Sequence, residues 1–246
     1  MISAPAAGAA NPPIAEGALV VLSGGQDSTT CLFWALRRFE RVKTVTFDYG
    51  QRHRVELDAA AKIAELVGVP NIQINAPVLQ GTSPLVDHSR DVGTYADAAS
   101  LPGGLEDTFV PGRNILFLTI AGNVAYCHGL GNLVTGVAQE DFGGYPDCRQ
   151  SFIDAMQLAL REGLGAGDGD PRGEITIHTP LMNMTKRETV DLAARLPGCL
   201  DAMAYSHTCF QGQVPPCGQC HACLLRAKGF EAAGVTDPLL ARLGRE

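Results

Sequence analysis

The 246-residue sequence has neither a long apolar run nor a stripe of basic residues. A membrane-spanning helix needs roughly 20 consecutive apolar residues, and no stretch of the chain approaches that length. Lys and Arg together number 19 against 26 Asp and Glu, giving a formal net charge of −7. Proteins that hold long nucleic acids usually carry a basic footprint, because contacts to phosphates supply much of their affinity. The composition therefore predicts a small-molecule substrate, with no membrane and no nucleic-acid partner.

The N-terminal segment lacks the features of a secretion signal. Residues 1–17 are rich in Ala, Pro and Gly and contain neither a basic start nor an apolar stretch. We expect a disordered tail here and a cytoplasmic protein. In a reducing compartment the eight cysteines are not expected to form disulfides.

Short apolar runs alternate with amphipathic stretches from residue 18 onward. Such alternation predicts βαβ units, with helices wound onto both faces of a parallel sheet. Strands are predicted at Ala18–Leu22, Thr44–Phe47, Ile72–Asn75, Leu133–Val137 and Glu174–His178. Helices are predicted at Ser28–Phe39, Val55–Val67, Ile115–Cys127 and Ser151–Glu162. We therefore predict an α/β fold, a Rossmann-like doubly wound sheet of about five strands over residues 18–200, with ligands beyond the carboxyl ends of the strands.

Two further segments stand out from this pattern. Residues 76–112 contain several Pro and Gly and show little periodicity, as in loops that close over a site or link domains. Thr185 and Glu188 have the spacing of a capping box, which predicts a helix through about Arg195.

A glycine-rich loop, Ser23-Gly24-Gly25-Gln26-Asp27-Ser28, follows the first predicted strand and precedes a helical pattern. Paired glycines let the backbone present N–H groups, and a helix N-terminus adds its dipole, so the loop suits phosphate. Asp27 is a candidate Mg²⁺ ligand. The loop is neither a Walker A nor a Gly-x-Gly-x-x-Gly turn. It is similar to the SGGxDS motif of the PP-loop (N-type ATP pyrophosphatase) superfamily, whose members cleave ATP between the α and β phosphates and adenylate an acid or carbonyl oxygen.

We therefore predict that ATP binds at this loop, with Asp27 and Ser28 catalytic. The predicted ATP-binding residues are Leu22, Ser23, Gly24, Gly25, Gln26, Asp27, Ser28, Thr29, Thr30, Cys31 and Leu32.

Four cysteines near the C-terminus have the spacing C-x7-C-x2-C-x2-C: Cys209, Cys217, Cys220 and Cys223. Four thiolates can close a tetrahedral zinc site, and a closed shell leaves no position for substrate. We predict a structural zinc within a small C-terminal segment, residues 201–246. An iron–sulfur cluster, which also takes four cysteines, is the alternative.

Three other cysteines have separate interpretations. Cys31 and Cys127 lie within helical apolar patterns and are expected to be small core residues. Cys148 lies in a loop that follows a predicted strand, where a structural thiol and a nucleophile are both open.

Further motifs extend from about Val20 to Phe230 and are similar to those of one family. They are SGGQDSTTCL at 23–32, YGQRHRVEL at 49–57, FVPGRNILFL at 109–118, DFGGYPDCR at 141–149, TPLMNMTKRETV at 179–190 and CGQCHAC at 217–223. With these stretches the sequence resembles the 7-cyano-7-deazaguanine synthase (QueC) family. One departure is Gly143, where many relatives are expected to have Ser.

The resemblance implies that 7-carboxy-7-deazaguanine, ammonia and ATP are converted into 7-cyano-7-deazaguanine, within queuosine biosynthesis. It also implies free ammonia as the nitrogen source, because no glutaminase nucleophile is evident, and a possible homodimer.

Several polar residues in the matching stretches are candidates for substrate contacts. Arg113 and Asn114, at a predicted helix start after Pro111 and Gly112, are expected to meet a phosphate or the substrate carboxylate, and Arg113 is assigned to catalysis. Asp141 and Asp147 are expected to read the donor edge of the deazaguanine base, and the alternative for these acids is solvation or Mg²⁺ binding.

Two residues and the overall function keep alternatives. His53 is either at the nucleotide edge or structural, and Lys186 either reaches phosphate or lies on the solvated surface. The alternative functions are a nucleotide-binding protein without turnover and a tRNA-thiolating or tRNA-lysidine enzyme of the same superfamily. The acidic balance and the lack of an appended basic domain disfavour the tRNA enzymes.

Overall fold

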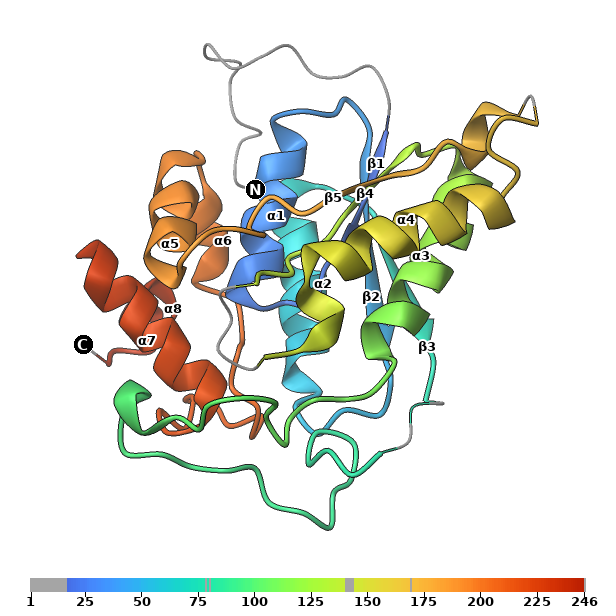
Figure 1. Cartoon of the computed structure of the whole chain (residues 1–246). Helices are drawn as coiled ribbons and strands as arrows, with labels where there is room; N and C mark the ends of the chain where they lie inside the picture. The colour runs from blue at the N-terminus through green and yellow to red at the C-terminus, as the bar shows by residue number, and fades with distance from the viewer. Residues whose placement is uncertain (1–16, 78, 80, 140–143, 169, 246) are drawn as a thin grey trace.

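Five parallel strands form one sheet, in the order β3-β2-β1-β4-β5, in the computed structural model of the chain (Figure 1). The structure describes residues 17–77, 79, 81–139, 144–168 and 170–245, so the expected N-terminal tail lies outside it except for Gly17. The strands are β1 Ala18–Val21, β2 Val42–Asp48, β3 Asn71–Asn75, β4 Asn132–Val134 and β5 Thr176–His178. The predicted parallel sheet is confirmed.

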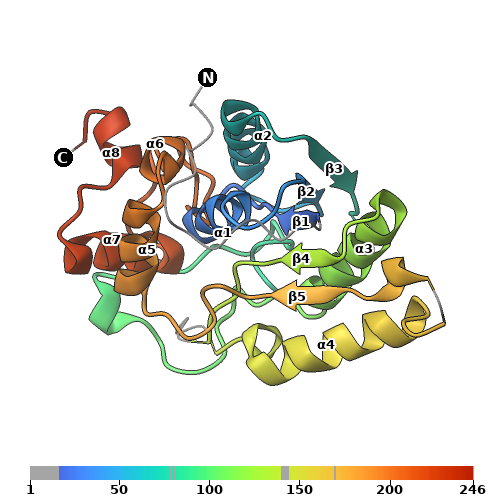
Figure 2. The ribbon, with the colours of Figure 1, turned by 90° about the horizontal axis from the view of Figure 1, so that it is seen from above.

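Helices cover both faces of this sheet, as a doubly wound fold requires (Figure 2). The helices are α1 Gln26–Leu36, α2 Val55–Val67, α3 Arg113–His128, α4 Gln150–Gly163, α5 Lys186–Arg195, α6 Cys199–Met203, α7 His221–Ala233 and α8 Pro238–Arg242. Short 3₁₀ turns lie at Ala98–Ser100, Pro146–Cys148 and Pro171–Gly173. One core packs α1, α2 and α5–α7 on one face, and a second packs α3 and α4 on the other.

The ends of several elements differ from the predicted ones for local reasons. Strand β4 ends at Val134 rather than Val137, because Gly136 passes under the glycine-rich loop. A Cβ added to Gly136 would lie 3.2 Å from the backbone of Asp27 and Ser28. Helix α1 begins at Gln26, two residues before the predicted start, and no side chain caps it. Its first N–H groups therefore stay available to a ligand.

Two predictions about helices have opposite outcomes. Helix α5 begins after the Thr185–Glu188 capping box, as predicted. Cys31 is buried in α1, whereas Cys127 in α3 is exposed, so its assignment to the core is wrong. The adjacent His128 and Gly129 are exposed as well, whereas Ala125 and Leu130 are buried, so Cys127 lies on the outer face of the helix end. No described helix combines the length and the apolar character needed to cross a bilayer.

The long segment 76–112 packs largely on the C-terminal segment, although Leu79 and Val86 also contact the core on the α3 face of the sheet. Leu85, Val92 and Val110 form a small buried cluster with Cys209, Cys220 and Cys223. The segment is also bonded through its backbone, since Tyr95 N donates to Gln219 O at 2.9 Å. It therefore covers the cysteine cluster.

A buried ion pair fixes the C-terminal segment. Arg226 on α7 donates from Nε and Nη2 to the two carboxylate oxygens of Asp237, at 2.6 and 2.8 Å. Its Nη1 donates to Ser206 Oγ at 2.8 Å and to Thr208 Oγ1 at 3.1 Å. The guanidinium thereby links α7, the N-terminus of α8 and residues 206–208.

We predict that Gly24→Ala is far more costly than the same change at Gly50. Gly24 has φ +91°, and an added Cβ would lie 2.2 Å from the carbonyl oxygen of Glu56. Gly50 has φ +83° but no atom within 4 Å of an added Cβ. Denaturant unfolding should show a loss of about 3 kcal/mol for Gly24→Ala and about 1 kcal/mol for Gly50→Ala. Equal losses would contradict the close approach of the loop to α2.

A second prediction concerns the Arg226–Asp237 pair. Asp237→Asn leaves the guanidinium buried without its counter-charge and should lower the free energy of unfolding by about 3 kcal/mol. The exposed pair Arg187–Asp191, whose side chains are 63% and 35% exposed, supplies the control. Asp191→Asn should change the same quantity by less than about 0.5 kcal/mol. A stable Asp237→Asn protein would show that the pair does not fix the segment.

Candidate active site

A cavity of about 280 Å³ opens at the carboxyl ends of β1, β2 and β4. Leu22 follows β1, Tyr49 follows β2, and Thr135 with Gly136 follows β4, and all four residues line it. This is where a doubly wound sheet places its ligands. The cavity is therefore the candidate active site.

The glycine-rich loop at Ser23–Ser28, hereafter the PP loop, is already closed on itself at the cavity. Ser28 Oγ accepts from Ser23 N at 3.2 Å and lies 3.0 Å from Ser23 Oγ. Ser28 Oγ donates to Gly25 O at 3.2 Å, and Gly25 N donates to Ser23 Oγ at 3.3 Å. The two hydroxyls thus hold the turn in shape ahead of the uncapped N-terminus of α1.

Asp27 and Lys186 form an ion pair on the cavity wall. Lys186 Nζ lies 2.8 Å from Asp27 Oδ2, and the side chains are 14% and 24% exposed. Lys186 comes from the first turn of α5 and lines the cavity, so the solvated-surface alternative for this residue is wrong. One carboxylate and one ammonium therefore face the PP loop together.

Arg113 and Asn114 occupy the first turn of α3 and line the cavity. Arg113 hydrogen-bonds the side chain of Tyr49. Burial raises the pKa of Tyr49 to about 12, so its phenol stays neutral at physiological pH. Tyr145, whose pKa burial also raises to about 12, lines the same side and lies 2.6 Å from Thr108 through its hydroxyl.

Asp147 lies beside this end of the cavity rather than in its lining. Its Oδ2 accepts from Asn114 N at 3.4 Å, and its carbonyl accepts from Asn114 Nδ2 at 3.1 Å. Burial raises the pKa of the Asp147 carboxyl, while Arg113 opposes that rise. The carboxylate is thus engaged at the start of α3.

The other residue expected to read the base, Asp141, lies outside the described residues together with Gly143. Cys148 does line the cavity, is buried, and has its sulfur 3.8 Å from Asn114 Nδ2.

Aromatic rings from two elements build the wall next to Arg113. Phe47 of β2 and Phe117 of α3 stack with centroids 4.2 Å apart and planes inclined by 9°. Tyr49 meets the edge of Phe117 at 5.3 Å. Sequence reasoning missed Phe117, because an aromatic residue inside an apolar helix gives no signal of which side it faces.

A further part of the cavity lining comes from α2 and from the C-terminal segment, and sequence reasoning missed most of it. It contains Glu56, His207, Phe210, His221 and Arg226, with His53. The backbone of this wall reaches the PP loop, since His207 N donates to Gly24 O at 2.8 Å. A usable signal was present: both new histidines lie within two residues of predicted metal ligands.

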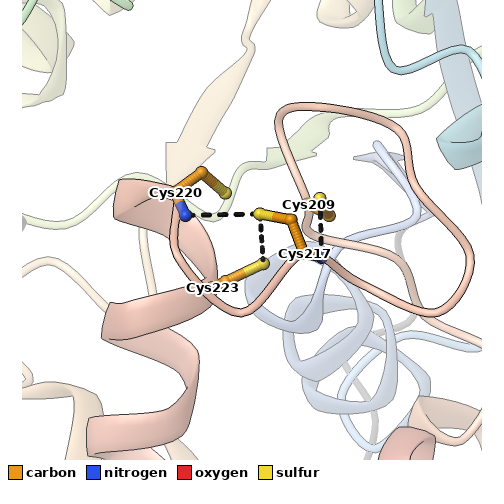
Figure 3. A group of neighbouring side chains, drawn as sticks. All are labelled: Cys209, Cys217, Cys220 and Cys223. Atoms are coloured by element: carbon orange, nitrogen blue, oxygen red, sulfur yellow. Dashed lines mark hydrogen bonds between the residues drawn. The ribbon is translucent and has the colours of Figure 1, made fainter. Parts of the chain in front are cut away.

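The four predicted cysteine ligands converge (Figure 3). Their sulfurs all lie within 4.8 Å of one another, and Cys217 Sγ lies 3.9 Å from Cys223 Sγ. Backbone N–H groups of Cys217 and Cys220 donate to the sulfurs of Cys209 and Cys217 at 3.4 and 3.3 Å. Mutual hydrogen bonds among the sulfurs lower the pKa of the Cys209 thiol and raise the pKa of the Cys220 and Cys223 thiols, as expected when close thiols share protons. Four converging sulfurs fit a bound metal ion.

Comparisons with known proteins agree with this site. Residues 17–234 match the family model described as "Queuosine biosynthesis protein QueC". The 7-cyano-7-deazaguanine synthase of Chromobacterium violaceum is 54% identical, over 94% of this chain and 96% of its own. The enzyme of the same name from Bacillus subtilis is 43% identical, over 88% and 94%.

Among solved structures, the U34-tRNA thiolase NcsA of Methanococcus maripaludis aligns with a TM-score of 0.43 at 18% identity, covering 92% of this chain and 67% of that one. A likeness this weak says nothing of activity. The family match and the sequence identities to the synthases are much stronger than this structural likeness. They cover nearly all of the sheet, the cavity and the cysteine cluster. The chain belongs to the QueC family of queuosine biosynthesis proteins.

Proposed function

We propose that this protein uses ATP to convert 7-carboxy-7-deazaguanine and ammonia into 7-cyano-7-deazaguanine. The observation that carries the proposal is one cavity that holds a phosphate loop, an acid–lysine pair and an arginine beside aromatic rings. Family membership supplies the substrate, because the relatives at 43–54% identity carry the name of this synthase.

The chemistry requires both oxygens of the carboxylate to leave. The carboxylate attacks the α phosphorus of ATP, which gives an acyl adenylate and pyrophosphate. Ammonia attacks the acyl carbon, AMP leaves with the first oxygen, and a proton is lost to give the amide. The amide oxygen attacks the α phosphorus of a further ATP and pyrophosphate leaves. Loss of AMP with the second oxygen and of two protons from nitrogen then gives the nitrile. No oxidant or reductant is consumed.

The PP loop and its neighbours are suited to the phosphate part of this reaction. Backbone N–H groups at the start of α1 and the hydroxyls of Ser23 and Ser28 bind the pyrophosphate. Asp27 is the residue that would hold Mg²⁺, which neutralises phosphate charge when bound. Lys186, paired with Asp27 at 2.8 Å, faces the same loop and would contact a phosphate oxygen. Catalysis here is positioning together with electrostatic stabilisation.

The carboxylate and the base are assigned to the α3 end of the cavity. Arg113 offers a forked contact to the substrate carboxylate or to a phosphate. The rings of Tyr49 and Phe117 supply an apolar wall for a planar base. Because the carboxylate of Asp147 is engaged with Asn114, Asp141 is the better candidate for accepting the N1–H and 2-amino donors of the base.

We further propose that the cysteine cluster holds zinc with a structural role. Four thiolates around one tetrahedral ion lie close together, whereas a four-iron cluster spreads its thiolates over separate metal atoms. The Cys217–Cys223 separation of 3.9 Å favours the single ion. A homodimer remains a prediction from the family resemblance.

The role of Asp27 is tested by Asp27→Asn. The change removes the charge proposed to place Mg²⁺ and should lower kcat about a hundredfold or more, with the thermal unfolding midpoint little changed. AMP release and nitrile formation, followed by mass spectrometry, provide the measurement. Asp58→Asn, at an exposed position on α2, removes the same charge away from the cavity and should leave turnover unchanged. Near-normal AMP release by folded Asp27→Asn protein would sink the assignment.

The metal is tested by elemental analysis of the purified protein and of Cys220→Ser. We expect about one zinc per wild-type chain, and loss of zinc with a lower unfolding midpoint in the variant. Cys127→Ser, which removes an exposed thiol outside the cluster, should keep the zinc content and the unfolding midpoint of the wild-type protein. Iron with sulfide, or a folded wild-type protein with no metal, would refute the zinc proposal.

A further inference from the structure

Helices α5 and α7 lie side by side and meet at a glycine (Figures 1 and 2). A Cβ added to Gly229 of α7 would lie 3.1 Å from both the Cβ and the carbonyl oxygen of Lys186, and 3.4 Å from its carbonyl carbon. Carbon atoms in ordinary contact lie about 3.5–4.0 Å apart, so a side chain at this position would force a displacement. The start of α5 therefore approaches α7 this closely because residue 229 has no side chain.

The glycines inside the other described helices have different surroundings. Gly163, the last residue of α4, has no atom within 4 Å of an added Cβ. Gly122 of α3 would meet Leu160 Cδ2 at 2.6 Å, but that atom is the end of a side chain that can change rotamer. Within the α-helices that the structure describes, Gly229 is thus the one glycine that faces the backbone of a residue lining the cavity.

Both helices are held in place near this contact. At the start of α5, Thr185 N donates to Glu188 Oε2 at 2.8 Å, and Glu188 N donates to Thr185 Oγ1 at 3.3 Å. On α7, Arg226 lies one turn before the glycine and donates to both carboxylate oxygens of Asp237, at 2.6 and 2.8 Å. Since neither helix is free to retreat, a methyl group added between them displaces the residue that it touches.

That residue is the lysine of the cavity wall. Lys186 is the first residue of α5, and its Nζ lies 2.8 Å from Asp27 Oδ2 of the PP loop. Its side chain is 14% exposed and begins at the contact with Gly229. A shift of the Lys186 backbone and Cβ is carried along the side chain to the ammonium group. The electrostatic energy of an ammonium and a phosphate depends on their separation, so the shift changes how ATP is bound.

We propose that Gly229 is a positioning residue of the reaction. By lacking a side chain, it allows the close approach of α5 to α7 that places the Lys186 ammonium at the PP loop. Glycine is a poorer helix former than alanine, so α7 gives up helix stability at this position in exchange for the approach. The inference rests on the proposed function, in which Lys186 contacts a phosphate oxygen of ATP.

The first test compares Gly229→Ala with Gly163→Ala, the same change in a helix with open space around it. Gly229→Ala should lower kcat/KM for ATP about fivefold, because a misplaced catalytic group loses rate steeply with distance. The KM values for ammonium and 7-carboxy-7-deazaguanine should stay within about twofold. The thermal unfolding midpoint should change little, since the better helix propensity of alanine opposes the crowding. Gly163→Ala should leave all of the kinetic constants unchanged.

A double-mutant cycle with Lys186→Met separates positioning from packing. Methionine keeps an unbranched apolar side chain and removes the ammonium group, and this change should lower kcat/KM for ATP about a hundredfold. In the Lys186→Met background, adding Gly229→Ala should cost less than about a further twofold, because there is no ammonium left to misplace. A glycine needed only for packing would lower kcat/KM by the same factor in both backgrounds.

The possible results distinguish the inference from the function on which it rests. Normal kcat/KM for ATP in Gly229→Ala, beside a large loss in Lys186→Met, overturns the inference and leaves the proposed function standing. Equal losses in the two backgrounds, or a Gly229→Ala protein that is unfolded at the assay temperature, assign the glycine to packing and also overturn it. Near-normal turnover by Lys186→Met removes the lysine from the phosphate site and the inference with it. A wild-type protein that forms no nitrile from ATP, ammonium and the acid defeats the proposed function itself.

Discussion

The position of β1 in the sheet is the constraint on which the site depends. Strand β1 pairs with β2 on one side and β4 on the other, and the helices that follow β1 and β4, α1 and α4, lie on opposite faces. The chain segments leaving β1 and β4 therefore diverge and leave a crevice at their carboxyl ends. The PP loop occupies one lip of this crevice. Gly136 occupies the other, where a Cβ would lie 3.2 Å from the loop backbone, so a residue with a side chain would push the lips apart.

The sheet supplies only part of the cavity, and the C-terminal segment supplies the rest. That segment reaches the PP loop by one backbone bond, from His207 N to Gly24 O. Two sets of contacts hold it there: the Arg226 fork to Asp237, Ser206 and Thr208, and the cysteine cluster that begins at Cys209. A metal ion bound by the cluster would therefore affect the cavity by fixing the position of residues 206–210, without contacting the reacting groups.

The sequence predicted what local patterns can specify. Contiguous β-branched and apolar residues such as Ala18–Val21 placed the strands within a few residues, and the PP loop and the Thr185 capping box are short motifs with one geometry. The sequence did not predict which face of a helix is exposed or which residues far apart in the chain are in contact. Helix α3 is apolar nearly all round, so its pattern left the exposure of Cys127 undetermined. The bond between Glu106 and His221 joins segments more than a hundred residues apart, and no periodic pattern in the sequence predicts it.

The charged side chains of the cavity differ in how far a neighbouring opposite charge neutralises them. Lys186 is matched by Asp27, and Arg226 by Asp237. Arg113 instead hydrogen-bonds Tyr49, whose pKa of about 12 keeps the phenol neutral, so that bond does not cancel the positive charge.

An anion consequently gains most at the α3 end, where Arg113 is fixed. The carboxylates of Glu56 and Glu106 are each paired with a histidine ring, Glu56 with His53 at 3.3 Å and Glu106 with His221 at 2.6 Å. Because the acids that line the cavity, Asp27 and Glu56, both have partners, the guanidinium of Arg113 and the N-terminus of α1 are the features that favour an anion there.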